Sequence, residues 1–88
     1  MNIKIIEKDD YFLVEIEENS TRTQHEITLE ESYYKKLTKE KISKKELIKR
    51  SFKFLLEREP KEAIFKKFNL KIIESYFSEY EKEISLDL

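Results

Sequence analysis

The feature that most restricts this 88-residue sequence is the complete absence of glycine. Glycine adopts positive φ angles without steric cost, and it lets a backbone approach a bound phosphate closely. The phosphate-binding loops of P-loop nucleotide-hydrolysing proteins and of dinucleotide-binding folds depend on both properties, so these two classes are excluded. Tight turns must use other residues, and Asn19 is the best candidate for a left-handed backbone conformation.

The length of the chain predicts a single domain over residues 1–88 with a marginal core. A domain of this size buries only about 60 to 65% of the surface of its unfolded chain. There is no cysteine and no recognisable set of metal ligands to supplement such a core, so we expect a homo-oligomer, most simply a dimer. Neither a signal peptide nor a run of about 18 apolar residues is present, so we expect a cytoplasmic protein outside the membrane.

Apolar and polar side chains alternate through residues 1–29, as they do in strands with one buried face. The alternation predicts strands around residues 3–5, 11–17 and 22–29. The second is apolar on both sides and should be the middle strand, and the third directs His25 inward. We therefore expect an α+β fold, with an N-terminal three-stranded antiparallel meander followed by three to four helices packed on one face.

A helical period replaces the alternation over residues 30–84. A short helix is expected around residues 30–37. Ser43 and Glu46 then form a capping box for a long helix that Pro60 ends. The apolar face of this long helix covers roughly 200°, wider than the face of an ordinary surface helix, so it should pack on two sides. That face consists of Leu47, Ile48, Phe52, Phe54, Leu55 and Leu56.

The C-terminal part predicts a short helix over residues 63–68, a break at Asn69, and a final helix. Apolar residues recur in that final helix at spacings of three, four, three and four, which is a two-heptad pattern. Such a seam can pair with its copy in a dimer or pack on the chain's own core, and we favour the core. The tail 85–88 should fray. The candidate oligomer seam is Leu70, Ile73, Phe77, Tyr80 and Ile84.

Charged residues make up 42% of the chain and are strongly segregated. Residues 1–34 carry a net charge of −6, residues 35–53 carry +7 and the remainder carries −2. The basic segment could bind an anionic partner, meet the acidic segment within the fold or across a dimer, or form a solvated surface. The abundance of Lys and Glu is typical of thermophile proteins, and an AT-rich genome would produce it too. The candidate anion-binding residues are Lys35, Lys36, Lys41, Ser43, Lys44, Lys45 and Lys49.

Catalytic and metal-binding residues are not identifiable in the sequence. His25 is the only histidine, and its inward strand position is typical of a hydrogen-bonded core imidazole. Zinc sites need three or four ligands at defined spacings, and no such set is present. We therefore expect no cofactor, no metal and no enzymatic activity.

The stretch from Thr23 to Arg58 resembles the ribbon-helix-helix DNA-binding fold of small repressors and antitoxins. The likeness lies in TQHEITL as the strand, EESYYKKL as the first helix and ISKKELIKRSFKFLLER as the second. In that family two strands pair across a dimer and enter the major groove, and the start of the second helix holds phosphate. The resemblance implies that bases would be faced by Gln24, Glu26 and Thr28, and phosphate by Ser43, Lys44 and Lys45.

A second likeness covers ELIKRSFKFLLEREP and the pattern F-x-L-x-x-I-x-x-YF-x-EYE between Phe68 and Glu81. These stretches are similar to small stand-alone bacterial and archaeal proteins of unknown function. The resemblance implies an intact single domain and brings no activity with it. The sequence therefore favours a non-enzymatic interaction or regulatory protein that forms a dimer or binds a protein partner. The alternative is a ribbon-helix-helix-like nucleic-acid-binding regulator or antitoxin that uses residues 35–53.

Overall fold

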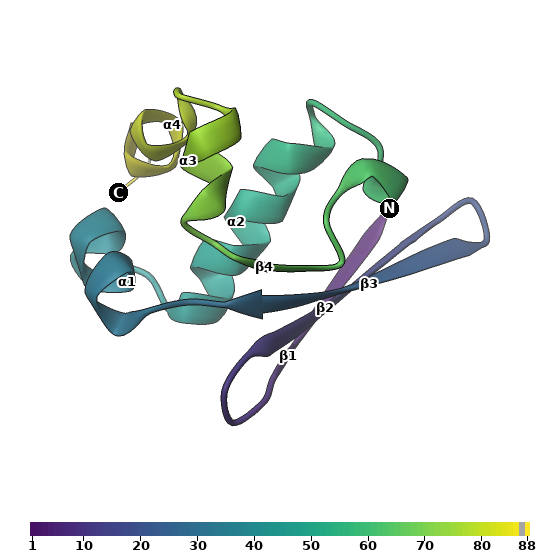
Figure 1. Cartoon of the computed structure of the whole chain (residues 1–88), viewed down its shortest axis with the longest axis horizontal. Helices are drawn as coiled ribbons and strands as arrows, with labels where there is room; N and C mark the ends of the chain where they lie inside the picture. Colours follow the sequence, from purple (N-terminus) through teal and green to yellow (C-terminus); the bar gives the residue numbers. More distant parts are fainter. Residues whose placement is uncertain (87) are drawn as a thin grey trace.

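Four strands form one mixed sheet in the order β1-β2-β3-β4 (Figure 1). The computed structural model describes residues 1–86 and 88. The strands are β1 (Asn2–Glu7), β2 (Phe12–Glu18), β3 (Thr21–Thr28) and β4 (Lys67–Asn69). The expected antiparallel meander is present in β1 to β3. The sheet as a whole is not a three-stranded meander, however, because the short β4 pairs in parallel with β3.

Two turns of this glycine-free chain use L-residues at positive φ. Asn19 (φ 53°) and Ser20 (φ 65°) form the two-residue connection between β2 and β3. Two consecutive positive φ angles are characteristic of the type I′ hairpin turn. The expectation for Asn19 is confirmed. Lys39 (φ 52°) and Glu40 (φ 61°) adopt the same left-handed conformation after the first helix, and no sequence signal marked them.

The two N-terminal helices begin close to where the sequence predicts. They are α1 (Glu31–Thr38) and α2 (Lys44–Leu56). The Ser43 hydroxyl accepts a hydrogen bond from the Glu46 N–H at 3.1 Å, which confirms it as the cap of α2. The Glu46 carboxylate instead accepts from Nε of Arg50 at 2.9 Å, so the reciprocal half of the capping box is replaced by an ion pair along the helix.

Two predictions for the C-terminal part are wrong. In place of a helix over residues 63–68, a single 3₁₀ turn η1 (Lys61–Ala63) leads into β4. The reason is pairing with β3: the Glu26 N–H donates to the Lys66 carbonyl at 2.7 Å, and the Leu70 N–H donates to the Thr28 carbonyl at 2.9 Å.

In place of one helix over residues 70–84, the chain forms α3 (Ile72–Tyr76) and α4 (Tyr80–Leu86). Residues 77–79 separate them, and Phe77 is extended, with φ −134° and ψ 96°. Helix α4 continues beyond the expected end at residue 84, and Asp87 lies outside the described residues.

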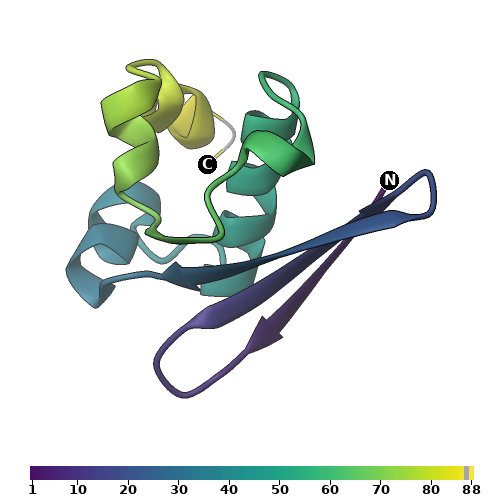
Figure 2. The ribbon, with the colours of Figure 1, turned by 45° about the vertical axis from the view of Figure 1, so that its right-hand side comes forward.

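The helices lie on one side of the sheet, as expected, and the other side of the sheet is bare (Figure 2). Val14 and Ile16 of β2 are fully buried beneath them. Phe52 of α2 faces the sheet, where its ring lies 5.5 Å from that of His25. Phe54 faces the other way, with its ring 5.2 Å from that of Tyr80 in α4. The broad apolar face of α2 therefore packs on two sides. No helix in residues 1–86 and 88 is long and apolar enough to cross a membrane.

Candidate functional site

Hydrogen bonds of polar side chains hold the connection between α2 and α3 against β3. Lys61 is only 4% exposed, because its stem lies in the fold while its ammonium group donates to the Thr21 hydroxyl. The same ammonium group pairs with the Glu62 carboxylate at 2.7 Å, and this contact lowers the pKa of Glu62. A buried lysine requires such partners, since an unpaired charge away from water is costly. These contacts fix η1 against the β2–β3 hairpin.

His25 holds the next part of the same connection. Its side chain is 1% exposed, and its Nδ1 lies 2.7 Å from the Phe65 carbonyl. A carbonyl oxygen can only accept, so Nδ1 carries the proton, and Nε2 accepts from the Thr23 hydroxyl at 2.9 Å. Burial lowers the pKa of His25, which favours this neutral form. The imidazole thereby positions the backbone of Phe65 and has no ring nitrogen free for a ligand.

An apolar groove of about 170 Å³ lies between this connection, the end of α2 and α3. Its floor consists of residues that belong to the core of the domain. Because that floor is packed, the groove is already formed in the unbound chain. The floor residues are Leu55, Ile64, Phe68 and Ile73.

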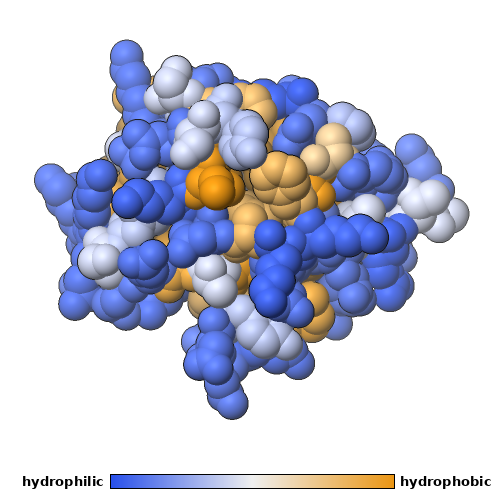
Figure 3. Space-filling model, viewed as in Figure 1, coloured by the Kyte–Doolittle hydropathy of each residue, from blue (hydrophilic) through white to orange (hydrophobic). Residues whose placement is uncertain are grey.

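The apolar rim of this groove consists of Phe65, Ile72 and Tyr76, which are 50%, 40% and 62% exposed. The rings of Phe65 and Tyr76 meet edge to face, with centroids 5.6 Å apart. In Figure 3, apolar side chains gather near the centre of the face that is viewed, within a surface that is otherwise largely hydrophilic. A contiguous exposed apolar patch of this kind marks an interaction surface more often than single exposed residues do.

One carboxylate borders the apolar groove. Glu59 lines it and is half-buried. Within residues 1–86 and 88, no hydrogen bond or ion pair engages the Glu59 carboxylate, whereas the neighbouring Glu57 pairs with Arg58 at 3.5 Å. The site therefore combines an apolar groove, an apolar rim and one negative charge.

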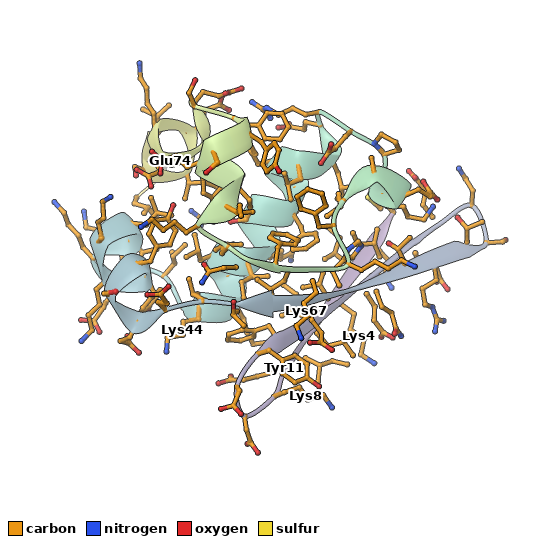
Figure 4. All side chains as sticks on the ribbon, in the orientation of Figure 1. Lys4, Lys8, Tyr11, Lys44, Lys67 and Glu74 are labelled. Atoms are coloured by element: carbon orange, nitrogen blue, oxygen red, sulfur yellow. The ribbon has the colours of Figure 1, made fainter. Side chains whose placement is uncertain are left out.

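The structure separates the candidate anion-binding residues into two groups. Ser43 and Lys44 are already engaged, since Ser43 caps α2 and the Lys44 ammonium group lies 2.7 Å from the Glu31 carboxylate. This hydrogen bond lowers the pKa of Glu31 and raises the pKa of Lys44. Figure 4 shows Lys44 near the passage from α1 to α2. Lys36 makes a longer contact of 3.9 Å with Glu81. The remaining members are exposed: Lys35, Lys41, Lys45 and Lys49.

The residues of the candidate oligomer seam lie in the chain's own core. Leu70, Ile73, Tyr80 and Ile84 are buried, and Phe77 is half-buried. The Tyr80 hydroxyl lies 2.6 Å from the Ser51 hydroxyl of α2. The core interpretation of the heptad spacing therefore accounts for all five positions.

The residues that the ribbon-helix-helix resemblance assigns to base reading lie on the bare side of the sheet. Gln24 donates to the Glu15 carboxylate at 2.8 Å, and Glu26 lies 3.9 Å from the ammonium group of Lys67. Thr28 is exposed. Because β2 and β4 occupy the two edges of β3, pairing of this strand across a dimer would require β4 to leave.

The sequence patterns did not identify the rim of the apolar groove. Phe65 was expected in a helix that does not form. Ile72 and Tyr76 are spaced as i and i+4 but fall outside the heptad seam, and this second apolar stripe is the signal that could have revealed them. Lys61 carried no signal, because lysine is rarely buried.

No protein-family model matches the chain, and neither the curated proteins nor the solved structures include a significant match to it. Within residues 1–86 and 88, no three His, Asp or Glu side chains converge as metal ligands would.

Proposed function

We propose that this chain is a non-enzymatic interaction protein that binds a short apolar segment of a partner protein in the apolar groove. The observation that carries the proposal is the apolar rim, whose three large side chains are 40 to 62% exposed around a preformed cavity. Solvation of such a patch is unfavourable, and a bound apolar segment would relieve it.

The size of the groove favours a single inserted side chain. An apolar cavity of about 150 Å³ accommodates a benzene-sized group. The groove, at about 170 Å³, is of comparable volume. One aliphatic or aromatic anchor residue of the partner would therefore fill it.

The area of the rim favours a short segment over a second copy of the chain. An aromatic side chain offers roughly 150 to 250 Å² when fully exposed, so the three rim residues together present roughly 300 Å². A stable dimer buries about 800 Å² on each subunit. The rim alone thus falls short of a dimer interface.

The negative charge of Glu59 indicates which type of residue should lie next to the anchor residue of the partner. Glu59 lines the apolar groove, and no hydrogen bond or ion pair engages its carboxylate among residues 1–86 and 88. A Lys or Arg next to the anchor residue would pair with it in surroundings where water is partly excluded, which strengthens the attraction. The proposed ligand is thus an apolar anchor residue flanked by a basic residue.

Selection from a random peptide library tests this proposal. Wild-type protein should enrich peptides with an apolar anchor next to Lys or Arg. Glu59→Gln should enrich the same anchor without the basic neighbour. Leu86→Ala is the matched control, since Leu86 is 71% exposed but lies away from the groove, and its selected peptides should be unchanged. Two results would contradict the proposal. One is selection of peptides without a shared anchor, and the other is a dimer by light scattering that Tyr76→Ala dissociates.

A further inference from the structure

The outer edge of β1 is an unpaired strand edge. The sheet order places β1 at one end, and β2 is its neighbour on the other side. Apart from the ladder with β2, no backbone hydrogen bond within residues 1–86 and 88 reaches Asn2–Glu7. Such an edge is a template for an additional strand.

The hydrogen-bond register identifies which amides of β1 point outward. The Lys8 N–H donates to the Tyr11 carbonyl at 2.9 Å, closing the β1–β2 turn. In an antiparallel pair, bonded and non-bonded residue pairs alternate from that point. Ile3, Ile5 and Glu7 therefore direct their N–H groups to the free edge, while the intervening residues bond to β2.

The helical period of α2 places two lysines on the side of this edge. Around the helix, Phe54 contacts α4, and Phe52 contacts His25 of β3. At 100° per residue, the positions that follow Phe52 in the same rotational sense, within about 60°, are Lys45, Leu56 and Lys49. The strand on that side, away from β4, is β1, on which α2 packs.

The positive charge beside the β1 edge favours an acidic segment over a second copy of the chain as the binding partner. Lys45 and Lys49 are exposed, and neither forms an ion pair with any of the described residues. Pairing of β1 with the β1 of a second copy would bring two such lysine pairs together, and like charges oppose that arrangement. An extended segment with acidic side chains would instead satisfy both the amides and the lysines.

We propose that the free edge of β1 binds an extended acidic segment of a partner protein as an additional strand, with its acidic side chains directed to Lys45 and Lys49. The edge supplies backbone hydrogen bonds and the lysines supply preference for acidic side chains, which is the division of roles in β-strand addition. Nucleic acid would engage the lysines but could not continue the ladder of backbone amides and carbonyls. This inference does not depend on the proposed function of the apolar groove.

Three fluorescein-labelled peptides test the proposal in anisotropy titrations with the wild-type protein. The peptide TEVEVET should bind. Its neutral analogue TQVQVQT should bind about tenfold more weakly, because it loses the charge attraction. The fully backbone N-methylated TEVEVET keeps its side chains and charge but has no N–H to donate, and it should not bind. Equal binding of the methylated peptide would overturn strand addition.

Hydrogen exchange locates the bound peptide. With saturating TEVEVET, the amides of Ile3, Ile5 and Glu7 should gain protection, while Asn2, Lys4 and Ile6, already bonded to β2, should change little. Failure of the three outward amides to gain protection would overturn the proposal.

A charge-reversal pair tests the lysines. Lys45→Glu with Lys49→Glu should weaken TEVEVET binding at least about tenfold. The matched control is Lys71→Glu with Lys82→Glu, which makes the same charge change at exposed positions outside α2 and should leave affinity within about twofold. Equal weakening by both pairs would reduce the effect to overall charge and overturn the proposal. A 20-base-pair DNA duplex that binds more tightly than TEVEVET, with the same dependence on Lys45 and Lys49, would assign the lysines to nucleic acid instead.

Discussion

Replacement of Lys39 by glycine should stabilise the protein. Lys39 follows α1 at φ 52° and ψ 31°, and its N–H donates to the Lys35 carbonyl at 2.8 Å. This left-handed position at the end of a helix is the one that glycine occupies most readily. The Lys39 side chain is exposed, so its removal takes away no packing contact of the core.

The expected gain follows from two opposing terms. An L-residue in the left-handed conformation costs roughly 1 to 2 kcal/mol, which glycine avoids. Glycine loses more backbone freedom on folding, at roughly 0.5 to 1 kcal/mol. Lys39→Gly should therefore raise the free energy of unfolding by about 0.5 to 1 kcal/mol. The control Lys35→Gly makes the same change inside α1 and should lower it by about 0.5 to 1 kcal/mol, since that position is helical.

Urea denaturation followed by far-UV circular dichroism measures both variants. With a slope of about 1 to 2 kcal/mol per molar urea, the midpoint should rise by about 0.5 M for Lys39→Gly and fall by a similar amount for Lys35→Gly. Opposite signs of the change at Lys35 inside α1 and at Lys39 just after it are the diagnostic result. A lower midpoint for Lys39→Gly would refute the reasoning about the helix end.

Three further variants test individual contacts. Tyr80→Phe removes the buried hydroxyl that meets Ser51 at 2.6 Å, and calorimetry should show a loss of about 1 kcal/mol, or roughly 4 to 8 °C in Tm. Arg58→Lys removes the planar group that lies 3.6 Å from the Phe54 ring centroid, and urea midpoints should show a loss of about 0.5 to 1 kcal/mol. Burial holds the pKa of His25 in the folded chain below its ordinary value of 6.5. At a pH between the lowered pKa and 6.5, the unfolded chain therefore binds more protons than the folded chain. Wild-type stability should therefore fall as pH drops below 6.5, and this fall should be smaller in His25→Gln, as thermal unfolding between pH 7.5 and 5.5 would show.

The sequence predicts the N-terminal half well because its determinants are local. The alternation around β2 and β3 and the Ser43 cap each involve side chains close together in the chain. The left-handed Asn19 was found because asparagine tolerates that conformation, whereas Lys39 has no such preference and is held there by the connection from α1 to α2.

The C-terminal half depends on contacts that a local pattern cannot reveal. Strand β4 has three residues, and its pairing with β3 joins positions about forty residues apart, such as Ile27 and Phe68. That pairing removes the expected helix and turns Phe65 outward. The candidate site could therefore not be predicted, because its rim depends on the pairing of β4, and the sequence pattern predicted a helix over residues 63–68 instead.

The affinity of a library-selected peptide for wild-type protein and for Tyr76→Ala tests the central claim most directly. Isothermal titration should show a loss of about 2 kcal/mol, or roughly thirtyfold in Kd, because Tyr76 is the most exposed aromatic residue of the apolar rim. Leu86→Ala, which truncates an even more exposed apolar side chain elsewhere, should bind as the wild type does. An affinity of Tyr76→Ala within about twofold of the wild-type value would contradict the assignment of binding to the groove.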